Sequence, residues 1–176
     1  MKSSTATPTT VPPIFVYGTL MNSQVVSVLL NRSWPPTIDD VSVQPARLYG
    51  YSRHPVKNCV FPAIVPSTNA AGFVNGMLVA ENILTPAEMD MMDWYESDEY
   101  NRVTVPVNIL EGDSCNKDSI MAQVYVWRDD LTSHLELDQE WSYDRFCEKD
   151  LEWYLDHTVR PCRADMERRG MTDPTS

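Results

Sequence analysis

The chain has 176 residues, a hydrophobic fraction of 43% and a formal net charge of −11. This length predicts one domain, since domains usually span roughly 100–200 residues, and the hydrophobic content excludes wholesale disorder. The acidic surplus argues against nucleic acid or an anionic membrane surface as a partner, because a surface of this sign repels phosphates. The apolar stretches are far shorter than the roughly 20 residues that a transmembrane helix needs.

Both ends of the chain are poor in residues that a core could bury. Residues 1–12 are mostly Ser, Thr and Pro and predict a disordered tail, and residues 164–176 predict a polar tail. A single domain is therefore expected over residues 13–163. The N-terminus has no apolar secretory core and the four cysteines form no CxxC pair, so we expect reduced thiols in a cytoplasmic protein.

The first part of the chain predicts a strand, a glycine turn and a helix in direct succession. Residues 14–17 form a β-branched and aromatic run typical of a buried strand, and Gly18 ends it. Asn22 is suited to cap a helix that runs to Leu30. Further short strands are predicted over residues 45–51, 61–65 and 73–80.

The turn between this strand and helix is a candidate binding loop, formed by Tyr17, Gly18, Thr19, Leu20, Met21 and Asn22. A strand–Gly–helix junction exposes backbone N–H groups near a helix N-terminus, where they can bind a carboxylate or a developing oxyanion. Gly18 would let the backbone approach a ligand closely. The alternative is an ordinary turn without a ligand.

A second helix is predicted to begin at Thr85, because Thr85, Pro86 and Glu88 form a capping box with proline in the first turn. At 100° per residue, Glu96 falls on the same stripe as two methionines, Met89 and Met92, which favour burial. It also lies near the helix C-terminus, where the macrodipole disfavours negative charge.

Burial and the macrodipole would both raise the pKa of Glu96 towards neutrality and make it a usable general base or acid. The alternative is a frayed last turn, which would leave Glu96 in water or pair it with Arg102.

The second half of the chain predicts a hairpin followed by a helix. Apolar residues alternate over 102–110 and 119–128, which indicates two paired antiparallel strands. Residues at helical spacing then predict one amphipathic C-terminal helix with Ser142 as its cap, and its apolar members are Cys147, Leu151, Tyr154, Leu155 and Thr158. Strands outnumber helices without βα alternation, so the expected class is α+β with a small sheet or barrel.

Other reactive residues are arranged in no recognisable site. The three histidines are far apart and lack HxH or HExxH spacing, so no zinc site is expected. The serines lack a G-x-S-x-G context. The acidic residues Glu136, Asp138 and Glu140 lack the glycine of a calcium-binding loop.

Several of these segments together resemble a known family. The stretch Phe15-Val16-Tyr17-Gly18-Thr19-Leu20 resembles the YG(S/T)L signature of gamma-glutamylcyclotransferase-like proteins. Asp93-Trp94-Tyr95-Glu96, followed by Tyr100 and Arg102, resembles the family's D-x-x-E and Y-x-R motif. Between them, Ala46 to Tyr51, Phe61 to Ile64 and Val74 to Gly76 follow its A-x-L-x-G-[FY], [FY]-P-A-[IV] and V-x-G patterns. The resemblance covers about residues 14–127, and the segment Trp141 to Leu155 looks like the plant and fungal avirulence-induced branch.

This resemblance implies a small mixed β-barrel flanked by helices, with the C-terminal amphipathic helix as an addition. It implies an enzyme that cyclises a gamma-glutamyl amine or dipeptide to 5-oxoproline and releases the amine, with no metal and no cofactor. Glu96 would be the general base and acid, and the loop from Tyr17 to Asn22 would bind the substrate. Met21 and Asn22 stand where the glutathione-specific branch usually has a tryptophan soon after the loop, which argues against glutathione as the preferred substrate.

Three further residues are candidates for supporting roles. Tyr100 and Arg102 match the motif; Arg102 would either pair with a carboxylate or orient Glu96. Tyr125 would either face the cavity or pack in the barrel. The competing functional hypothesis is a non-catalytic ligand-binding or stress-response module on the same scaffold.

Overall fold

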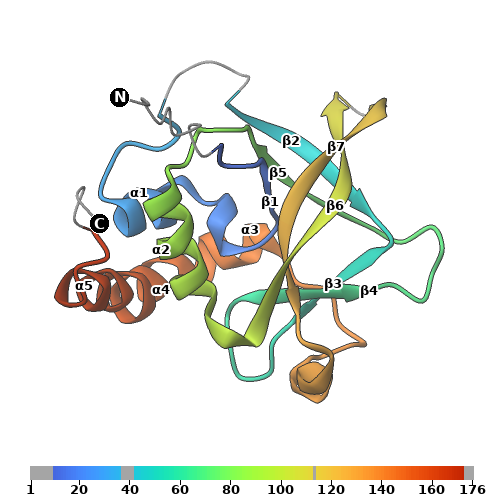
Figure 1. Ribbon diagram of the computed structural model, residues 1–176. Coiled ribbons are helices and arrows are strands. Elements are labelled where there is room, and N and C mark those ends of the chain that lie inside the picture. Colours follow the sequence, from blue (N-terminus) through green and yellow to red (C-terminus); the bar gives the residue numbers. More distant parts are fainter. Residues whose placement is uncertain (1–9, 37–41, 113, 173–176) are drawn as a thin grey trace, which may run out of the picture.

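The computed structural model describes residues 10–36, 42–112 and 114–172 and has a closed barrel on one side and a layer of helices on the other (Figure 1). The barrel strands follow the order β1-β5-β2-β6-β7. They span Ile14–Val16 (β1), Val43–Tyr49 (β2), Phe73–Val79 (β5), Tyr100–Glu111 (β6) and Ser114–Trp127 (β7). β1 runs antiparallel to β5 and parallel to β7, so the barrel is mixed. A separate hairpin pairs β3 (Tyr51–Pro55) with β4 (Pro62–Pro66).

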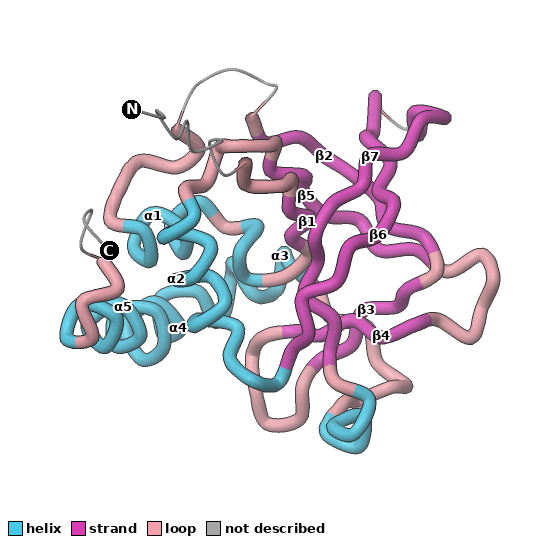
Figure 2. The backbone as a smooth tube through the Cα atoms, viewed as in Figure 1, coloured by secondary structure: helices cyan, strands magenta, loops and turns pink. Residues whose placement is uncertain are grey.

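The α-helices gather on one side of this barrel, whereas a 3-10 turn over Asp129–His134 lies apart from them (Figure 2). α1 spans Ser23–Leu30 and α2 spans Pro86–Glu96. The C-terminal helical segment, residues 143–168, consists of α3 (Tyr143–Arg145), α4 (Leu151–Tyr154) and α5 (Arg160–Arg168), joined by π-helical turns over Phe146–Asp150 and Leu155–Val159. The predicted class, α+β with a small mixed barrel, flanking helices and a C-terminal helix, is confirmed. Within the described ranges, no helix combines the length and the apolar character needed to cross a bilayer.

The helix starts lie where the sequence predicts them. The Asn22 side chain accepts hydrogen bonds from the N–H groups of Gln24 and Val25, at 2.9 and 3.3 Å. Thr85 and Glu88 form the reciprocal capping box, and Ser142 accepts from the N–H of Arg145. These caps satisfy backbone donors that a helix start leaves unpaired, and each depends only on neighbours in sequence.

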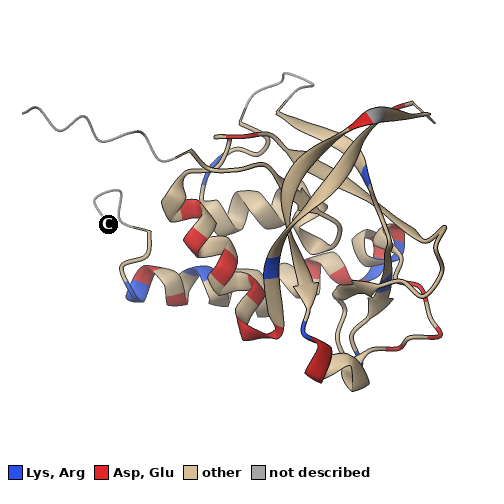
Figure 3. Cartoon of the chain, turned by 45° about the vertical axis from the view of Figure 1, so that its right-hand side comes forward, with Lys and Arg blue, Asp and Glu red and all other residues tan. Residues whose placement is uncertain are grey.

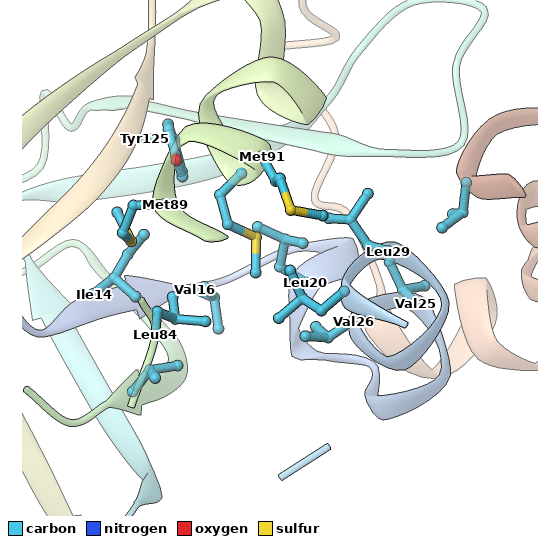
Figure 4. Packing of buried hydrophobic residues seen from close by; sticks show 14 of the residues in the cluster. Ile14, Val16, Leu20, Val25, Val26, Leu29, Leu84, Met89, Met91 and Tyr125 are labelled. Atoms are coloured by element: carbon cyan, nitrogen blue, oxygen red, sulfur yellow. The ribbon is translucent and has the colours of Figure 1, made fainter. Parts of the chain in front are cut away.

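The main hydrophobic core lies between the barrel and the helices, where α1 and α2 pack their apolar faces against β1 (Figure 4). A second core fills the barrel itself and includes Phe15, Leu48, Val107 and Val124, each 0 or 1% exposed. β1 contributes to both, because successive side chains of a strand point to opposite faces. Gly76 on β5 lets β1 come close, since a Cβ there would press on the Val16 carbonyl oxygen and the Phe15 ring.

The structure corrects the predicted tails. Val11 is buried and exchanges hydrogen bonds with Asn82, so residues 10–12 belong to the domain; residues 1–9 lie outside the described part. At the other end α5 continues to Arg168 and Met166 is fully buried, whereas the sequence predicts a polar tail from residue 164. Met166 continues the apolar stripe of the helix, although most of its neighbours in sequence are charged. Residues 173–176 lie outside the described part.

The strand predictions need two corrections. The strand predicted over residues 45–51 is divided at Gly50, whose φ of 81° turns the chain into β3, which the sequence did not predict. The strands of the predicted hairpin are also longer, reaching Glu111 and starting again at Ser114. Their polar tips lack the alternation that indicates a strand because this end of the hairpin is largely exposed.

Candidate active site

A cavity of about 210 Å³ lies where the barrel meets the helices. Its wall combines the loop after β1, the end of α2, strands β6 and β7, and the C-terminal helical segment. It is lined by Phe15, Val16, Tyr17, Gly18, Thr19, Leu20, Phe61, Pro62, Tyr95, Glu96, Ser97, Glu99, Tyr100, Tyr125, Tyr154 and Thr158. Segments far apart in the sequence therefore meet around one space.

Glu96 is the last residue of α2, and its carboxyl group faces this cavity. The helix ends there because Ser97 adopts φ 64° and ψ −172° and its N–H returns to the Asp93 carbonyl oxygen. Burial, and then the negative charge of Asp93, raise the pKa of Glu96 from its ordinary value of 4.5 to about 8. Acidic side chains follow α2 and the turn after it (Figure 3).

No group in the described part of the chain donates a hydrogen bond to the Glu96 carboxyl. In its neighbour Asp93, by contrast, each carboxyl oxygen already has a partner. The Tyr125 hydroxyl donates to Asp93 Oδ1 at 2.7 Å, and Arg102 Nη2 lies 3.1 Å from Asp93 Oδ2. Of the two carboxyl groups on this helix end, Glu96 is therefore the one available to a ligand.

The loop opposite Glu96 exposes backbone donors. Thr19–Met21 form a short 3-10 turn, and Gly18 and Thr19 accept backbone hydrogen bonds from Met21 and Asn22. Among the bonds formed by described residues, none uses the N–H groups of Gly18, Thr19 or Leu20. A Cβ on Gly18 would lie 2.9 Å from Pro62 Cγ, so glycine is required for the loop to approach β4.

Arg53 on β3 contacts this loop but is not among the residues of the cavity wall, and no sequence pattern predicted it as a site residue. Its Nη1 donates to the Tyr17 carbonyl oxygen at 2.6 Å, and its guanidinium stacks 5.2 Å from the centre of the Trp141 ring. The Tyr17 carbonyl and the Gly18 N–H belong to the same peptide unit, so a cation on the oxygen makes the N–H a stronger donor. A sequence pattern that predicted a β-strand directly after Gly50 would have been needed to place Arg53 near this loop.

The structure brings most, but not all, of the predicted site residues together. Tyr17, Gly18, Thr19 and Leu20 line the cavity with Glu96, whereas Met21 and Asn22 are absent from its wall. Asn22 is instead committed to capping α1.

The predicted supporting residues divide between two spaces. Tyr100 and Tyr125 line the first cavity and also a more open second one of about 600 Å³, which Arg102 lines too. The carboxylate partner of Arg102 is Asp93 and not Glu96. Tyr125 faces the cavity and is also packed, since its ring is 4% exposed.

The cavity wall contains several tyrosine hydroxyl groups besides the Glu96 carboxyl. Burial raises the pKa values of Tyr17, Tyr95 and Tyr100 well above their ordinary value, so these phenols stay neutral hydrogen-bonding groups. Over the described ranges, no three His, Cys, Asp or Glu side chains come together as a set that could hold a metal ion.

Fold and site define a small mixed-barrel protein with one unpaired, partly buried carboxyl group facing a row of backbone donors, an arrangement suited to moving a proton to and from a bound ligand. The chain belongs to the family described as gamma-glutamyl cyclotransferase, AIG2-like, whose model matches residues 14–144.

Relatives in Arabidopsis thaliana agree with this assignment. The protein named AIG2 C is 35% identical over 149 residues, which cover 80% of this chain and 81% of the relative. AIG2 B is 31% identical over 168 residues, covering 92% and 91%. A solution structure of another Arabidopsis thaliana protein is similar with a TM-score of 0.57 and 27% identity, covering 98% of this chain and 90% of that one.

Proposed function

We propose that the protein is a gamma-glutamylcyclotransferase that converts a gamma-glutamyl amine or dipeptide into 5-oxoproline and releases the amine, with Glu96 as general base and acid. The observation that carries the proposal is the Glu96 carboxyl group, which has a pKa of about 8, lacks a hydrogen-bond partner among the described residues and faces the cavity.

In the proposed reaction the substrate's own α-amino group attacks its γ-carbonyl carbon. Glu96 in its ionised form takes a proton from the attacking nitrogen as the new N–C bond forms. The protonated carboxyl then gives this proton to the leaving nitrogen as the old amide bond breaks. No electron or phosphoryl donor is needed, and a pKa near neutrality suits a group that must both take and return a proton.

The loop is proposed to hold the glutamyl arm folded for this ring closure. Attack within one molecule has a high effective concentration, so positioning supplies much of the rate. The unused N–H groups of Gly18, Thr19 and Leu20 would bind negatively charged oxygen, and Arg53 would strengthen the first of them through the Tyr17 carbonyl.

The experiment that tests this proposal is a substrate panel. Purified protein is incubated with gamma-glutamyl dipeptides, alkyl amines and gamma-glutamyl-lysine in a buffer containing EDTA and a thiol reductant, and 5-oxoproline is measured by mass spectrometry. We expect product from at least one class of substrate. Loss of activity in EDTA with recovery in zinc or magnesium would contradict a metal-free mechanism. Binding of the panel without any 5-oxoproline would favour the non-catalytic ligand-binding module.

A further inference from the structure

The C-terminal helical segment, residues 143–168, forms part of the cavity wall although the family model ends at residue 144. Two of its residues, Tyr154 and Thr158, line the cavity beside the loop and Glu96. Tyr154 ends α4, and a π-helical turn over Leu155–Val159 follows it directly. Such turns within α-helices are frequent at functional sites.

The position of Tyr154 is fixed from several sides. Its ring lies edge-on to Phe146, with ring centres 5.4 Å apart, and is tilted against Phe61 at 6.5 Å. The residue is 4% exposed. Packing therefore holds the ring, and with it the hydroxyl group, at one place on the cavity wall.

This hydroxyl is one end of a chain of three. The Tyr154 and Tyr95 hydroxyl oxygens are 2.6 Å apart, and the Tyr95 oxygen is 2.8 Å from Thr19 Oγ1. Each hydroxyl carries one proton, so the group has three protons and forms two hydrogen bonds. Whichever way the bonds run, one O–H remains to be donated. When Thr19 donates to Tyr95 and Tyr95 to Tyr154, the remaining O–H is that of Tyr154 on the cavity wall.

The other tyrosines of the cavity wall have no such proton left. The hydroxyls of Tyr17, Tyr100 and Tyr125 donate to the Tyr125 carbonyl, the Pro62 carbonyl and Asp93, at 2.7, 2.9 and 2.7 Å. The wall also contains no lysine, arginine or histidine among its described residues. An anionic group bound there would depend on neutral donors, which include the loop N–H groups, the remaining proton of the hydroxyl chain and the Thr158 hydroxyl.

We propose that the hydroxyl chain Thr19–Tyr95–Tyr154 binds the α-carboxylate of the gamma-glutamyl substrate, which makes Tyr154 a substrate-positioning residue and the C-terminal helical segment part of the specificity site. This inference rests on the proposed function for the identity of the ligand. A carboxylate is the oxygen acceptor that such a substrate always carries, and hydrogen bonds to a charged acceptor are stronger than neutral ones. Burial raises the pKa of Tyr154 to about 12, so the phenol keeps its proton and can donate it to the ligand while its oxygen accepts from Tyr95.

The test measures binding apart from turnover. In a Glu96→Gln background, calorimetry compares gamma-glutamylalanine with the same compound bearing a primary carboxamide in place of the α-carboxylate. Adding Tyr154→Phe keeps the ring and its packing and removes the hydroxyl. We expect affinity for the carboxylate ligand to fall by about tenfold or more, as for a hydrogen bond to a charged group, and affinity for the carboxamide ligand to change far less.

The loss of discrimination between the two ligands is the decisive readout, because a merely structural hydroxyl would weaken both equally. Tyr95→Phe leaves the Tyr154 hydroxyl in place but removes the donor that directs the Tyr154 proton towards the ligand, so it should reduce the discrimination by a smaller factor. Tyr49→Phe is the matched control, since its hydroxyl contacts Cys115 on an exposed face outside the cavity wall.

Equal losses for both ligands, unchanged affinities, or no binding of either ligand to the Glu96→Gln protein would overturn the inference. Turnover by the wild type is measured separately. If the wild type forms no 5-oxoproline but the discrimination depends on Tyr154, the proposed function fails and the carboxylate site stands. If the wild type is active and the discrimination is unchanged in Tyr154→Phe, only this inference fails.

Discussion

The barrel interior and the interface between barrel and helices share one strand but differ in whether their polar groups have hydrogen-bond partners. Phe15 and Tyr17 belong to the interior core, and Ile14 and Val16 to the interface core. Inside the barrel the Tyr17 hydroxyl is satisfied by the Tyr125 carbonyl at 2.7 Å. At the interface Glu96 faces a cavity without a hydrogen-bond partner from the described residues.

This difference indicates that the barrel interior serves stability and the interface serves chemistry. A closed, densely packed barrel excludes unpaired polar groups, because each one would cost free energy without a partner. The interface with the helices retains a space, so an ionisable group can be partly buried and still reach a ligand. The barrel supplies rigidity and the interface supplies the reactive group.

We expect the greatest change in activity from a substitution at the interface between barrel and helices. Glu96→Gln keeps the shape of the side chain and removes the proton acceptor, so we expect cyclisation to slow by about 10²–10⁴-fold, as measured by 5-oxoproline formation. The matched control is Asp90→Asn, which removes one negative charge from an exposed position on the same helix. Full activity of Glu96→Gln would refute its assignment as the base.

A substitution that creates a cavity inside the barrel should lower stability and leave the activity of the folded protein unchanged. Leu48→Ala removes a side chain that is 1% exposed in the barrel interior, and we expect the free energy of unfolding to fall by about 2–5 kcal/mol in urea denaturation. Turnover per folded molecule should remain normal below the transition. Leu137→Ala, at a residue that is 50% exposed, is the control and should change stability by less than about 0.5 kcal/mol. If Leu48→Ala retained its stability but lost turnover, the barrel interior would not be limited to a role in stability.

The pH dependence of stability should isolate the contribution of one buried carboxyl group, that of Glu96. The fold favours protonated Glu96, so between its ordinary pKa of 4.5 and its folded pKa of about 8 the folded protein binds more protons than the unfolded chain. The contribution of Glu96 to stability is therefore greatest at low pH and is lost as the pH rises through that window.

Thermal denaturation of wild type and Glu96→Gln should reveal this linkage. The two proteins should be similarly stable near pH 4, and Glu96→Gln should become the more stable one towards pH 9. The wild-type rate should rise over the upper part of the same window as the carboxyl ionises, with substrates of different amine pKa used to separate the substrate's own titration. Parallel stability curves over the whole range would show that the pKa of Glu96 is not raised.

The smallest expected effect concerns the turn that ends α2 at Glu96. Ser97 has φ 64° and ψ −172°, a region that is essentially restricted to glycine and costs a residue with a side chain about 1–3 kcal/mol. Ser97→Gly removes this strain but gives the unfolded chain more freedom, so we expect a net gain of about 1 kcal/mol, or roughly 2–4 °C in Tm. A drop in Tm on this substitution would show that the turn is unstrained.

Much of the fold could be predicted because its signals are local. The caps at Asn22, Thr85 and Ser142 and the alternating hairpin strands each depend on residues a few positions apart. The methionine stripe of α2 likewise predicted where Glu96 would face. β3 was missed because its residues are uniformly half-buried and show no alternation.

The candidate site was predictable only where its residues lie in such local patterns. Glu96 and the loop from Tyr17 to Leu20 follow directly from a helix stripe and a strand–glycine–helix junction. Arg53 and Tyr154 carried no site signal, since one lies on an unpredicted strand and the other fits equally well as a residue of an amphipathic core helix. Asn22 lies in the predicted loop but is committed to the cap of α1.

The helix starts, the hairpin and the carboxyl group at the end of α2 could be derived from the sequence, because chain neighbours alone set caps, periodicity and side-chain faces. Three contacts could be seen only in the folded protein: Arg102 pairs with Asp93 and not with Glu96, Arg53 donates to the Tyr17 carbonyl, and Tyr154 reaches Tyr95. These contacts join residues up to 59 positions apart in the sequence. They exist only once the barrel has closed and the C-terminal helical segment has packed against it, since packing of the whole chain fixes which distant side chains meet.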